Sequence, residues 1–481
     1  MEQMSKGNDG SVIEKLQHKM STTVKMLGVG FLILVLWLSS FFVSGLVGER
    51  SNRQEQVHQE IAEKWGAPQL VAGPVITIPY LRTYVDTNNK DRVARDIIYL
   101  LPEALDIKAN INPIQKKRGI FSSTVYTSEL NFAGTFNTKL LDDLTLNPND
   151  ILWSEASVSL SLSDTRGIGE DINIKWADKD LPWKPGSQLV LDAPNPNLFT
   201  YRKGADFVPM PYSYSEPNTL SVENKIMTGT GLHALVSARP NAMYDFNFKL
   251  NLAGSRLLEF VPAGKLTKVN MTSTWITPSF IGAFLPTEST LDANGVSAKW
   301  QVSSLSRSFP DAWIGDSVSN NIIGQSALGI NLLQSVDFYT LIGRTIKYAI
   351  LFIALTFLSF FLFEVIAKLR IHPMQYLLIG IALVLFYLLL LSFAENIGFA
   401  PAYTLATVMT VGLIWTYSRS VLKTGKQANL IVGILIALYA YLYIILQLEE
   451  LALLFGSVLL FAVLAIVMRI TRGIDWYREN A

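Results

Sequence analysis

Four carboxylates lie in sequence contexts where an acidic side chain could take part in catalysis or binding. Asp311 and Asp316 lie in and just after the stretch Phe309-Pro310-Asp311-Ala312-Trp313. Flanking proline and aromatic residues set this pair apart from the carboxylates of ordinary polar loops. Convergent carboxylates would be needed for general acid–base chemistry outside the membrane. We nevertheless expect Asp311 and Asp316 to cap a turn rather than to catalyse a reaction.

The other two candidates belong to the apolar C-terminal part of the chain. Glu364 is the one ionisable residue within five long apolar runs, and an ionisable residue inside a membrane is a pointer to function. Lys368 follows four residues later, so an i,i+4 ion pair is the interpretation that we favour over a proton relay. Glu395 is the single acidic residue of the short connection Ala394–Phe399.

Motifs of catalytic, metal and cofactor sites are otherwise missing from the sequence. A Walker loop, a G-x-S-x-G elbow and an H-E-x-x-H helix do not occur. The chain has no cysteine, and its histidines are scattered: His18, His58, His233 and His372. Gly229–Ala234 formally fits G-x-G-x-x-A, but no βαβ pattern surrounds it, so we expect a turn. We predict no catalytic residue, no cofactor and no metal site.

The elements that position the candidate residues are largely membrane helices. Half of the 481 residues are hydrophobic and 16% are charged, and the apolar residues are concentrated in six runs. Met26–Val47 contains no charge and is long enough to cross a bilayer. Five further runs of about 18–20 residues would each span roughly 27–30 Å as helices. They are Ala349–Ile366, Met374–Phe393, Ala400–Tyr417, Ala428–Leu446 and Leu451–Met468. We predict six transmembrane helices, one N-terminal and five C-terminal.

Charges in the short connections predict the orientation of these helices. Basic connections alternate with acidic ones along the chain, and basic residues favour the cytoplasmic side. The basic residues are Lys6, Lys15, Lys19, Lys25, Lys368, Arg370, Arg419, Lys423, Lys426, Arg469, Arg472 and Arg478. Glu395, Glu449 and Glu450 mark the acidic turns. Both termini are therefore expected in the cytoplasm, and the long segment between the first two helices is expected outside.

The predicted layout has five parts. A cytoplasmic tail (1–25) precedes the first helix (26–47), and an external β-rich domain (48–343) precedes a five-helix bundle (344–468) and a second tail (469–481). The first helix could instead be a cleaved signal peptide, with Val43-Ser44-Gly45 as the cleavage site. Its apolar core is long for a signal peptide, so we favour an uncleaved anchor.

The external segment begins as a helix and then changes to strands. Glu49–Lys64 is polar with an apolar stripe and reads as a continuation of the first helix. Beyond it apolar and polar residues alternate, as in strands with one buried face. Examples are 105–111, 158–162, 244–252 and 296–302. We expect a mainly-β, sandwich-like domain of antiparallel strands, either one sandwich or two side by side with a boundary near 182–218.

Several stretches of the sequence resemble one known family. They are Gly73–Tyr80, Phe309–Trp313, His372–Gly380, Phe386–Ser392, Glu395–Phe399, Tyr441–Tyr443, Leu446–Glu449 and Thr471–Tyr477. Together they resemble the CreD family of bacterial inner-membrane proteins, which are known as cell envelope integrity or colicin tolerance proteins. The resemblance extends from the first apolar run to the C-terminus. Asn396 departs from it, because the family pattern leads us to expect histidine there.

The resemblance implies a bacterial inner-membrane protein produced under the control of a two-component sensor and regulator. It implies a role in envelope maintenance, in tolerance of certain colicins and in the response to antibiotics that act on the cell wall. It also places the external domain in the periplasm. The family offers no catalytic residue to carry over to this chain.

Three hypotheses for function are compatible with the sequence. We favour a non-enzymatic inner-membrane protein whose external domain binds an envelope component or a protein partner. A membrane transporter is an alternative, although the helices hold little buried charge and are not broken by Gly and Pro. A periplasmic envelope-modifying enzyme is the other alternative. The expected contacts are the lipid bilayer and protein partners in the periplasm or inner membrane. The net charge of +1 argues against nucleic acid, and the oligomeric state cannot be read.

Overall fold

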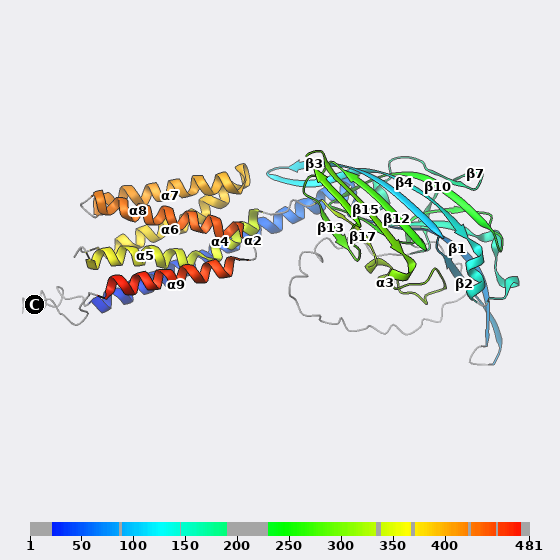
Figure 1. Cartoon of the computed structure of the whole chain (residues 1–481), viewed down its shortest axis with the longest axis horizontal. Coiled ribbons are helices and arrows are strands. Elements are labelled where there is room, and N and C mark those ends of the chain that lie inside the picture. The colour runs from blue at the N-terminus through cyan, green and yellow to red at the C-terminus, as the bar shows by residue number, and fades with distance from the viewer. Residues whose placement is uncertain are drawn as a thin grey trace, which may run out of the picture. The chain divides into compact units, whose positions relative to one another are not determined.

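A computed structural model of the chain describes residues 22–85, 89–144, 146–189, 229–332, 338–366, 371–421, 425–448 and 451–472. The chain divides into two compact units (Figure 1). The helical unit contains Met1–Arg53 and Val336–Ala481, and the β unit contains Gln54–Ser335. The predicted lobe boundary near 182–218 lies almost wholly outside the described residues.

Helix α2 (Thr22–Trp65) is a single helix that leaves the helical unit and enters the β unit. Its first half is the apolar run that ends at Val47, and its second half is polar. The polar half contains no proline or glycine between Glu49 and Lys64, so nothing interrupts the helical hydrogen bonds. Gly66, at a φ of +145°, and Pro68 then end the helix. The predicted continuation of the first apolar run as a helix is confirmed.

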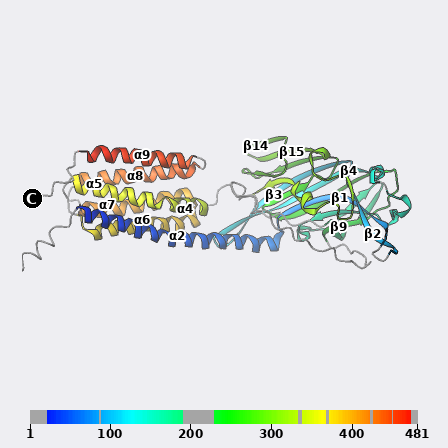
Figure 2. The same cartoon turned by 90° about the horizontal axis from the view of Figure 1, so that it is seen from below.

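The C-terminal half of the helical unit is built from apolar helices (Figures 1 and 2). They are α4 (Phe338–Lys347), α5 (Ala349–Ile366), α6 (Pro373–Ile397), α7 (Phe399–Val421), α8 (Gly425–Gln447) and α9 (Ala452–Thr471). Five helices of the described chain are long and apolar enough to span a membrane, counting α2. Helices α4 and α5 form a pair bent by 47°, which makes a sixth span if counted as one. The six predicted spans thus correspond to five straight helices and one bent pair.

Aromatic side chains form the centre of the helical unit. The Tyr403 hydroxyl donates to the Tyr439 carbonyl oxygen at 2.7 Å and so joins α7 to α8. Phe386 of α6 meets both rings edge-on, at centroid distances of 5.5 and 4.8 Å. Gly398 allows the tight turn between α6 and α7 because its φ of +80° is open to glycine. Helix α9, by contrast, has no buried residue and packs only lightly on α8.

The β unit consists of two sheets that enclose a common core. The nine-stranded sheet has the order β13 (Ser279–Gly282), β17 (Leu328–Asn331), β11 (Leu257–Val261), β1 (Gln69–Val85), β5 (Ser157–Leu162), β9 (Gly229–Leu235) and β8 (Lys184–Ser187), with β2 (Asp91–Leu100) paired to β1 and β16 (Ala312–Ile314) to β2. The eight-stranded sheet has the order β14 (Glu288–Asp292), β15 (Gly295–Ser303), β12 (Leu266–Ser273), β3 (Ala104–Arg118), β4 (Phe121–Asn137), β10 (Met243–Ser255), β6 (Asn173–Trp176) and β7 (Lys179–Pro182). Short helices connect them: η1 (Thr138–Leu144), η2 (Pro148–Asp150), η3 (Trp153–Glu155), η4 (Thr165–Gly167), η5 (Ser304–Ser306) and α3 (Asn320–Gln325). The mainly-β, sandwich-like prediction is confirmed.

Phenylalanines from both sheets meet in the core of the β unit. Phe132 of β4 stacks on Phe248 of β10 at 4.6 Å and contacts Phe260 of β11, in the other sheet, at 6.4 Å. Phe132 is 1% exposed, so replacing it with alanine would cost about 3–5 kcal/mol of stability. The core is therefore one continuous cluster across both sheets.

Two pairings differ from the expected antiparallel pattern. Strand β1 runs parallel to β11, and β3 runs parallel to β12, while the remaining recorded strand pairs are antiparallel. Strands β10 and β11 are almost continuous in sequence but belong to different sheets, with only Arg256 between them. Arg256 has a φ of +61°, and this left-handed residue turns the chain from one sheet to the other. When the chain passes from one sheet to the other, the next strand can pair parallel to its neighbour. The alternation of side chains shows which face of a strand is buried, but it does not show whether the strand pairs parallel or antiparallel.

Candidate functional site

Asp311, which directly precedes β16, is bonded through both its side chain and its backbone to other parts of the β unit. Its carboxylate accepts a hydrogen bond from the buried Arg307 guanidinium, which also lies 4.3 Å from the Phe309 ring centroid. Its backbone oxygen accepts from the Leu101 N–H at 2.9 Å. Burial lowers the pKa of Arg307, and Asp311 opposes that shift. These contacts favour the structural interpretation of Asp311.

Asp316, beyond the other end of β16, belongs to a different environment. Tyr99 lies nearby, stacked on Trp313 at 5.0 Å, and its hydroxyl donates to the Gln188 carbonyl. Burial, together with the negative charge of Asp316, raises the pKa of Tyr99 to about 12. The recorded contacts of the two carboxylates differ: Arg307 and Leu101 contact Asp311, and Tyr99 lies near Asp316.

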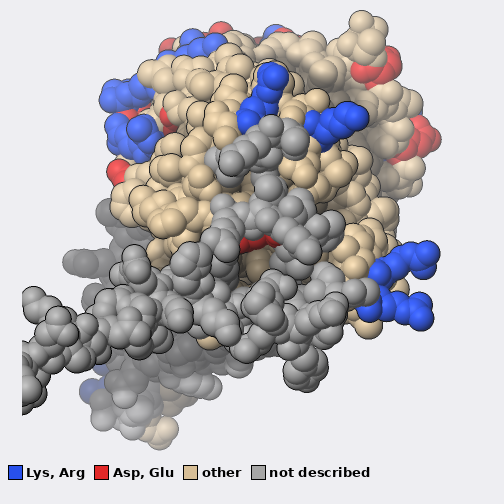
Figure 3. All heavy atoms as spheres, turned by 90° about the vertical axis from the view of Figure 1, so that its left-hand side faces the viewer, with Lys and Arg blue, Asp and Glu red and all other residues tan. Residues whose placement is uncertain are grey.

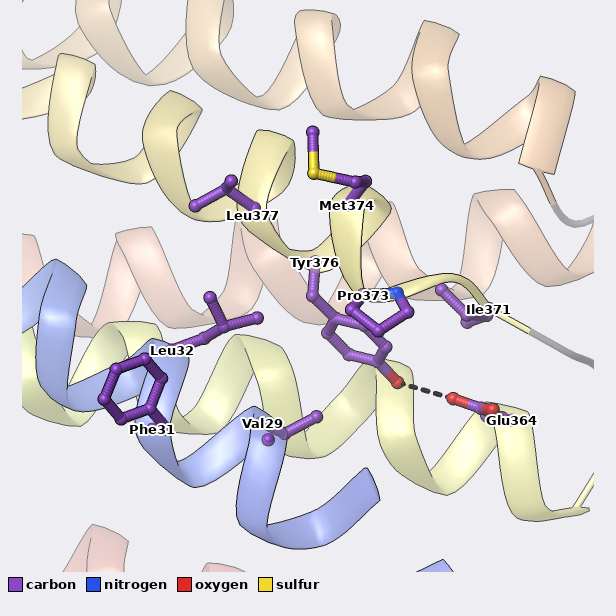
Figure 4. Close-up of a pocket in the computed structure, with 10 residues that line it drawn as sticks. Val29, Phe31, Leu32, Glu364, Ile371, Pro373, Met374, Tyr376 and Leu377 are labelled. Carbon is purple, nitrogen blue, oxygen red and sulfur yellow. Dashed lines mark hydrogen bonds between the residues drawn. The ribbon is translucent and has the colours of Figure 1, made fainter. Parts of the chain in front are cut away.

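Glu364 lines a pocket of about 280 Å³ within the helical unit (Figure 4). The Tyr376 hydroxyl donates to Glu364 Oε2 at 3.0 Å, and Glu364 is 7% exposed. The remaining lining is almost wholly apolar and comes from α2, α6 and the residues before α6: Gly28, Val29, Phe31, Leu32, Ile371, Pro373, Met374 and Leu377. Lys368, the predicted partner of Glu364, lies outside the described residues.

The start of α6 places Tyr376 beside this carboxylate. His372 caps the helix by accepting from the Met374 N–H, while Gln375 reaches back to the His372 N–H. Pro373 occupies the first turn, where its missing N–H costs nothing. The capped turn therefore holds Tyr376 rigidly, and the arrangement can keep one acidic side chain in an apolar setting.

Glu395, at the end of α6, joins three helices of the helical unit. The Tyr339 hydroxyl of α4 donates to Glu395 Oε1 at 3.0 Å, and Arg50 Nε of α2 lies 3.7 Å from the same oxygen. Tyr339 is 2% exposed, so this contact is sheltered from water. Asn396 turns away and donates to the Ser392 carbonyl. Glu395 therefore links α6 to α4 and to α2 within the helical unit.

A larger hollow, which was not predicted, lies on the outer face of the eight-stranded sheet. This pocket has a volume of about 510 Å³. Its floor is formed by β3, β4 and β10, and its walls by the end of α2 and the loop after β5. The lining residues are Lys64, Trp65, Asn112, Thr127, Ser128, Glu129, Arg166, Gly167, Ile168, Gly169, Asn251, Leu252 and Ala253. We call it the sheet pocket.

A hydrogen-bonded clamp holds the walls of the sheet pocket together. Asp164 accepts from the Ala67 N–H at 2.9 Å and binds the Arg166 guanidinium, while Arg166 Nη1 donates to the Glu63 carbonyl at 2.7 Å. Burial alone would raise the pKa of Asp164, but the hydrogen bonds from Arg166 and Ala67 outweigh it and lower the pKa. Gln69 links the same loop to β10 by donating to the carbonyls of Asp164 and Ala253. The loop is thus fixed to α2 on one side and to the sheet on the other.

The sheet pocket has a mixed lining of polar and apolar groups, and two of its charged side chains are paired within the protein. Arg166 is paired with Asp164 at 2.9 Å, and Glu129 with Lys249 at 2.9 Å. Asn112 and Thr127 lie opposite each other on β3 and β4, and both are exposed. Their amide and hydroxyl groups, with the Trp65 ring at the rim, suit a neutral ligand rich in hydroxyl and amide groups.

The comparisons with known proteins identify the family. The family model described as "Inner membrane protein CreD" matches residues 21–477. The chain is also 31% identical over 459 residues to the inner membrane protein CreD of Escherichia coli (strain K12), covering 94% of this chain and 93% of that protein. The chain belongs to the CreD family.

Membership of the CreD family agrees with the helices described above. The Escherichia coli relative is named as an inner membrane protein, and this chain has several helices able to span a membrane, so it is a multi-pass inner-membrane protein. The relative's name attributes no catalytic activity to it. The resemblance seen in the sequence is thereby confirmed at the level of the family.

The described residues also contain no group of three or more His, Asp and Glu side chains that could hold a metal ion. The two described histidines of the β unit lie far apart in the chain and contact backbone oxygens. His58 Nε2 lies 3.0 Å from the Ser122 oxygen, and His233 Nδ1 lies 3.2 Å from the Gly186 oxygen. Each of these two histidines thus has a contact with a backbone oxygen of a distant residue.

Sequence reasoning missed the sheet pocket for a specific reason. Alternation correctly places Asn112, Glu129 and Asn251 on the outward face of their strands, where polar residues are ordinary. Their proximity depends on the pairing of β3 with β4 and of β4 with β10, and the last pairing joins residues more than 100 positions apart. The one signal in the sequence was the outward run of asparagines, which by itself indicates only solubility.

Proposed function

We propose that this inner-membrane protein supports the integrity of the cell envelope by binding a polar component of the cell wall in the sheet pocket, without catalysing a reaction. The observation that carries the proposal is the sheet pocket itself, a hollow of about 510 Å³ lined by amide, hydroxyl, charged and apolar groups. The resemblance to cell envelope integrity proteins supports the choice of an envelope ligand.

The ligand that fits best is a neutral glycan of the wall. Arg166 is paired with Asp164 and Glu129 with Lys249, which leaves Lys64 as the lining charge without a recorded ion pair. Uncharged hydroxyl and amide groups of a sugar can exchange hydrogen bonds with Asn112 and Thr127. Such a site needs no acid or base, which agrees with the different recorded contacts of Asp311 and Asp316.

The proposal includes an orientation, with both termini in the cytoplasm and the β unit in the periplasm. The ends of α7 and α9 and the start of α8 carry Arg419, Arg469, Arg472 and Lys426. Figure 3 looks onto this end of the helical unit, where Lys and Arg side chains project beside uncharged residues. The opposite end carries Glu395 together with Arg50, and the larger number of basic residues at the first end supports the proposed orientation under the positive-inside rule.

Binding to wall glycan tests the proposal directly. We expect the full-length protein in detergent to bind purified glycan strands, and the double variant Asn112→Ala/Thr127→Ala to bind at least about tenfold more weakly, since two or three hydrogen bonds to the ligand are lost. Asn247→Ala is the matched control, because Asn247 is an exposed asparagine of the same sheet that does not line the pocket. Equal binding by all three proteins, or no binding by the parent, would refute the proposed ligand.

A further inference from the structure

A row of five residues crosses the outer face of the eight-stranded sheet and alternates lysine with asparagine. Strands β15, β12, β3, β4 and β10 lie side by side in this sheet (Figure 1). Residues that pair in register on neighbouring strands point to the same face of the sheet. In strand order, the residues that pair in this way are Lys299, Asn270, Lys108, Asn131 and Lys249. We call this row the lysine–asparagine ladder.

The sheet sets the spacing of the ladder. Neighbouring strands lie about 4.8 Å apart, so successive lysines are separated by roughly 9.6 Å and the whole ladder spans roughly 19 Å. The three lysines and Asn131 are exposed, and Asn270 is partly exposed. The next row along the same strands has no such repeat, because it places Lys268 opposite Asp106. The ladder therefore presents positive charges at a regular interval, with an amide group between them.

The ladder begins at the rim of the sheet pocket, within the same unit and on the same face. Lys249 Nζ lies 2.9 Å from Glu129 Oε2, and Glu129 lines the pocket. Asn131 Nδ2 donates to the other oxygen of Glu129 at 3.4 Å. A linear polymer that fills the pocket and continues across the strands would therefore meet the ladder next.

The lysines of the ladder are available to an acidic ligand. Lys108 has no ion pair recorded among the described residues. Lys299 pairs with Glu288 and Lys249 with Glu129, but all four side chains are largely exposed. Exposed ion pairs of this kind are weak because water and salt screen them. Each ammonium group also has three N–H donors, so it can bind a ligand carboxylate while it keeps its contact with glutamate.

We propose that the lysine–asparagine ladder binds a glycan in which acidic and neutral sugars alternate. The ladder's role rests on the proposed function, since the ladder takes up the same glycan where it continues beyond the neutral sugar held in the sheet pocket. One sugar of an extended glycan is comparable in length to one interval between neighbouring β-strands, so every second sugar meets a lysine. Each lysine binds the carboxylate of an acidic sugar, and each asparagine exchanges hydrogen bonds with a hydroxyl or amide group of the neutral sugar between them.

Neutralising the carboxyl groups of the glycan tests the ladder. The full-length protein in detergent is titrated with purified glycan strands of the wall, and with the same strands after their carboxyl groups have been converted to uncharged amides. We expect the parent to bind the acidic strands about three- to tenfold more tightly at low salt. The double variant Lys108→Gln/Lys299→Gln should lose this preference and bind both kinds of strand as the parent binds the amidated ones. Neither lysine lines the sheet pocket, so binding within the pocket is kept.

Lys184→Gln is the matched control, because Lys184 is an exposed lysine of β8, in the other sheet. This variant should keep the parent's preference for acidic strands. Equal binding of acidic and amidated strands by the parent would overturn the role of the ladder and leave the proposed function in place. So would an unchanged preference in the double variant. If the parent binds neither kind of strand, the proposed function fails, and the role of the ladder fails with it.

Discussion

Arg256 Nη1 lies 2.8 and 3.0 Å from the two carboxylate oxygens of Glu55, so the residue that turns the chain between the two sheets also holds helix α2. The Arg256 backbone oxygen accepts from the Leu332 N–H at 2.7 Å. Glu55 and Leu332 are near the first and last described residues of the β unit. Arg256 thus joins the two ends of the β unit. Its side chain binds Glu55 near the first end, and its backbone oxygen binds Leu332 near the last.

The first prediction is that Arg256→Ala loosens the polar half of α2. The variant loses hydrogen bonds to a carboxylate at a position that is only 8% exposed, which costs about 2 kcal/mol. Hydrogen–deuterium exchange of residues 54–65 in the full-length protein should become faster, while exchange in α7 and α8 should stay unchanged. Lys268→Ala, at an exposed position of β12, serves as the comparison. Equal exchange in the parent and Arg256→Ala would contradict this role.

The second prediction concerns Glu259, a carboxyl group of β11 that is 3% exposed. Burial raises its pKa to about 7 from 4.5. The folded protein therefore keeps a proton that the unfolded chain releases between these values, so this group lowers the free energy of unfolding as pH rises from about 4.5 to 7. The full effect is at most about 3 kcal/mol. Its neighbours in register are Leu70 and Gly329, which offer no charge to offset burial.

Glu259→Gln should remove that pH dependence. We expect the unfolding temperature of the β unit to fall less between pH 5 and pH 8 in the variant than in the parent, and the variant to be the more stable protein at pH 8. Tryptophan fluorescence during heating measures both. Histidines also titrate in this range, so the quantity compared is the difference between the two proteins. An identical pH profile would show that Glu259 is not the titrating group.

The third prediction separates a structural role of Glu364 from a role in proton transfer. Glu364→Gln keeps an oxygen that can accept from Tyr376, so we expect normal insertion, stability and complementation of an envelope defect. Tyr376→Phe removes the hydrogen bond that the Tyr376 hydroxyl donates to Glu364 and should destabilise the helical unit by about 1–3 kcal/mol. Loss of complementation by a well-folded Glu364→Gln protein would instead support the transporter hypothesis.

The local features of this fold could be read from the sequence because they depend on neighbouring residues. Alternation at 105–111 and 244–252 predicts β3 and β10, and the apolar run from Met26 followed by a polar stripe predicts the single helix α2. The apolar runs likewise predict the spans, although the bend between α4 and α5 divides one of them. Periodicity reports which face of an element is buried, and here it did so correctly.

The arrangement of those elements could not be read because it depends on contacts far apart in the chain. Gln69 of β1 pairs in register with Leu258 of β11, and nothing in either strand specifies the other. Asp164 and Ala67 meet only because β1 and β5 are neighbours. Flanking residues mark Asp311 and Asp316 in the sequence, and position in a short connection marks Glu395, but none of these features specifies the residues that contact them. The sheet pocket depends on the pairing of β3 with β4, the pairing of β4 with β10 and the contact between Asp164 and Ala67.

Gly167 provides a test of the sheet pocket that does not alter any hydrogen-bonding side chain. A Cβ atom at Gly167 would lie 2.2 Å from the Ala253 carbonyl oxygen, far inside contact distance, whereas at Gly169 it would meet nothing within 4 Å. Both glycines line the pocket and are two residues apart in the same loop. The two substitutions therefore differ in whether the loop can remain against β10.

The fourth prediction is that Gly167→Ala displaces this loop and that Gly169→Ala does not. Overpacking of this kind costs about 1–3 kcal/mol, and here the strain is relieved when the loop lifts from the sheet. Hydrogen–deuterium exchange of residues 164–170 should accelerate in Gly167→Ala alone, and binding of glycan strands should weaken in that variant alone. A displaced loop with unchanged glycan binding would place the ligand elsewhere on the β unit. An undisturbed loop in Gly167→Ala would show that Gly167 is not the close contact that holds this wall of the pocket.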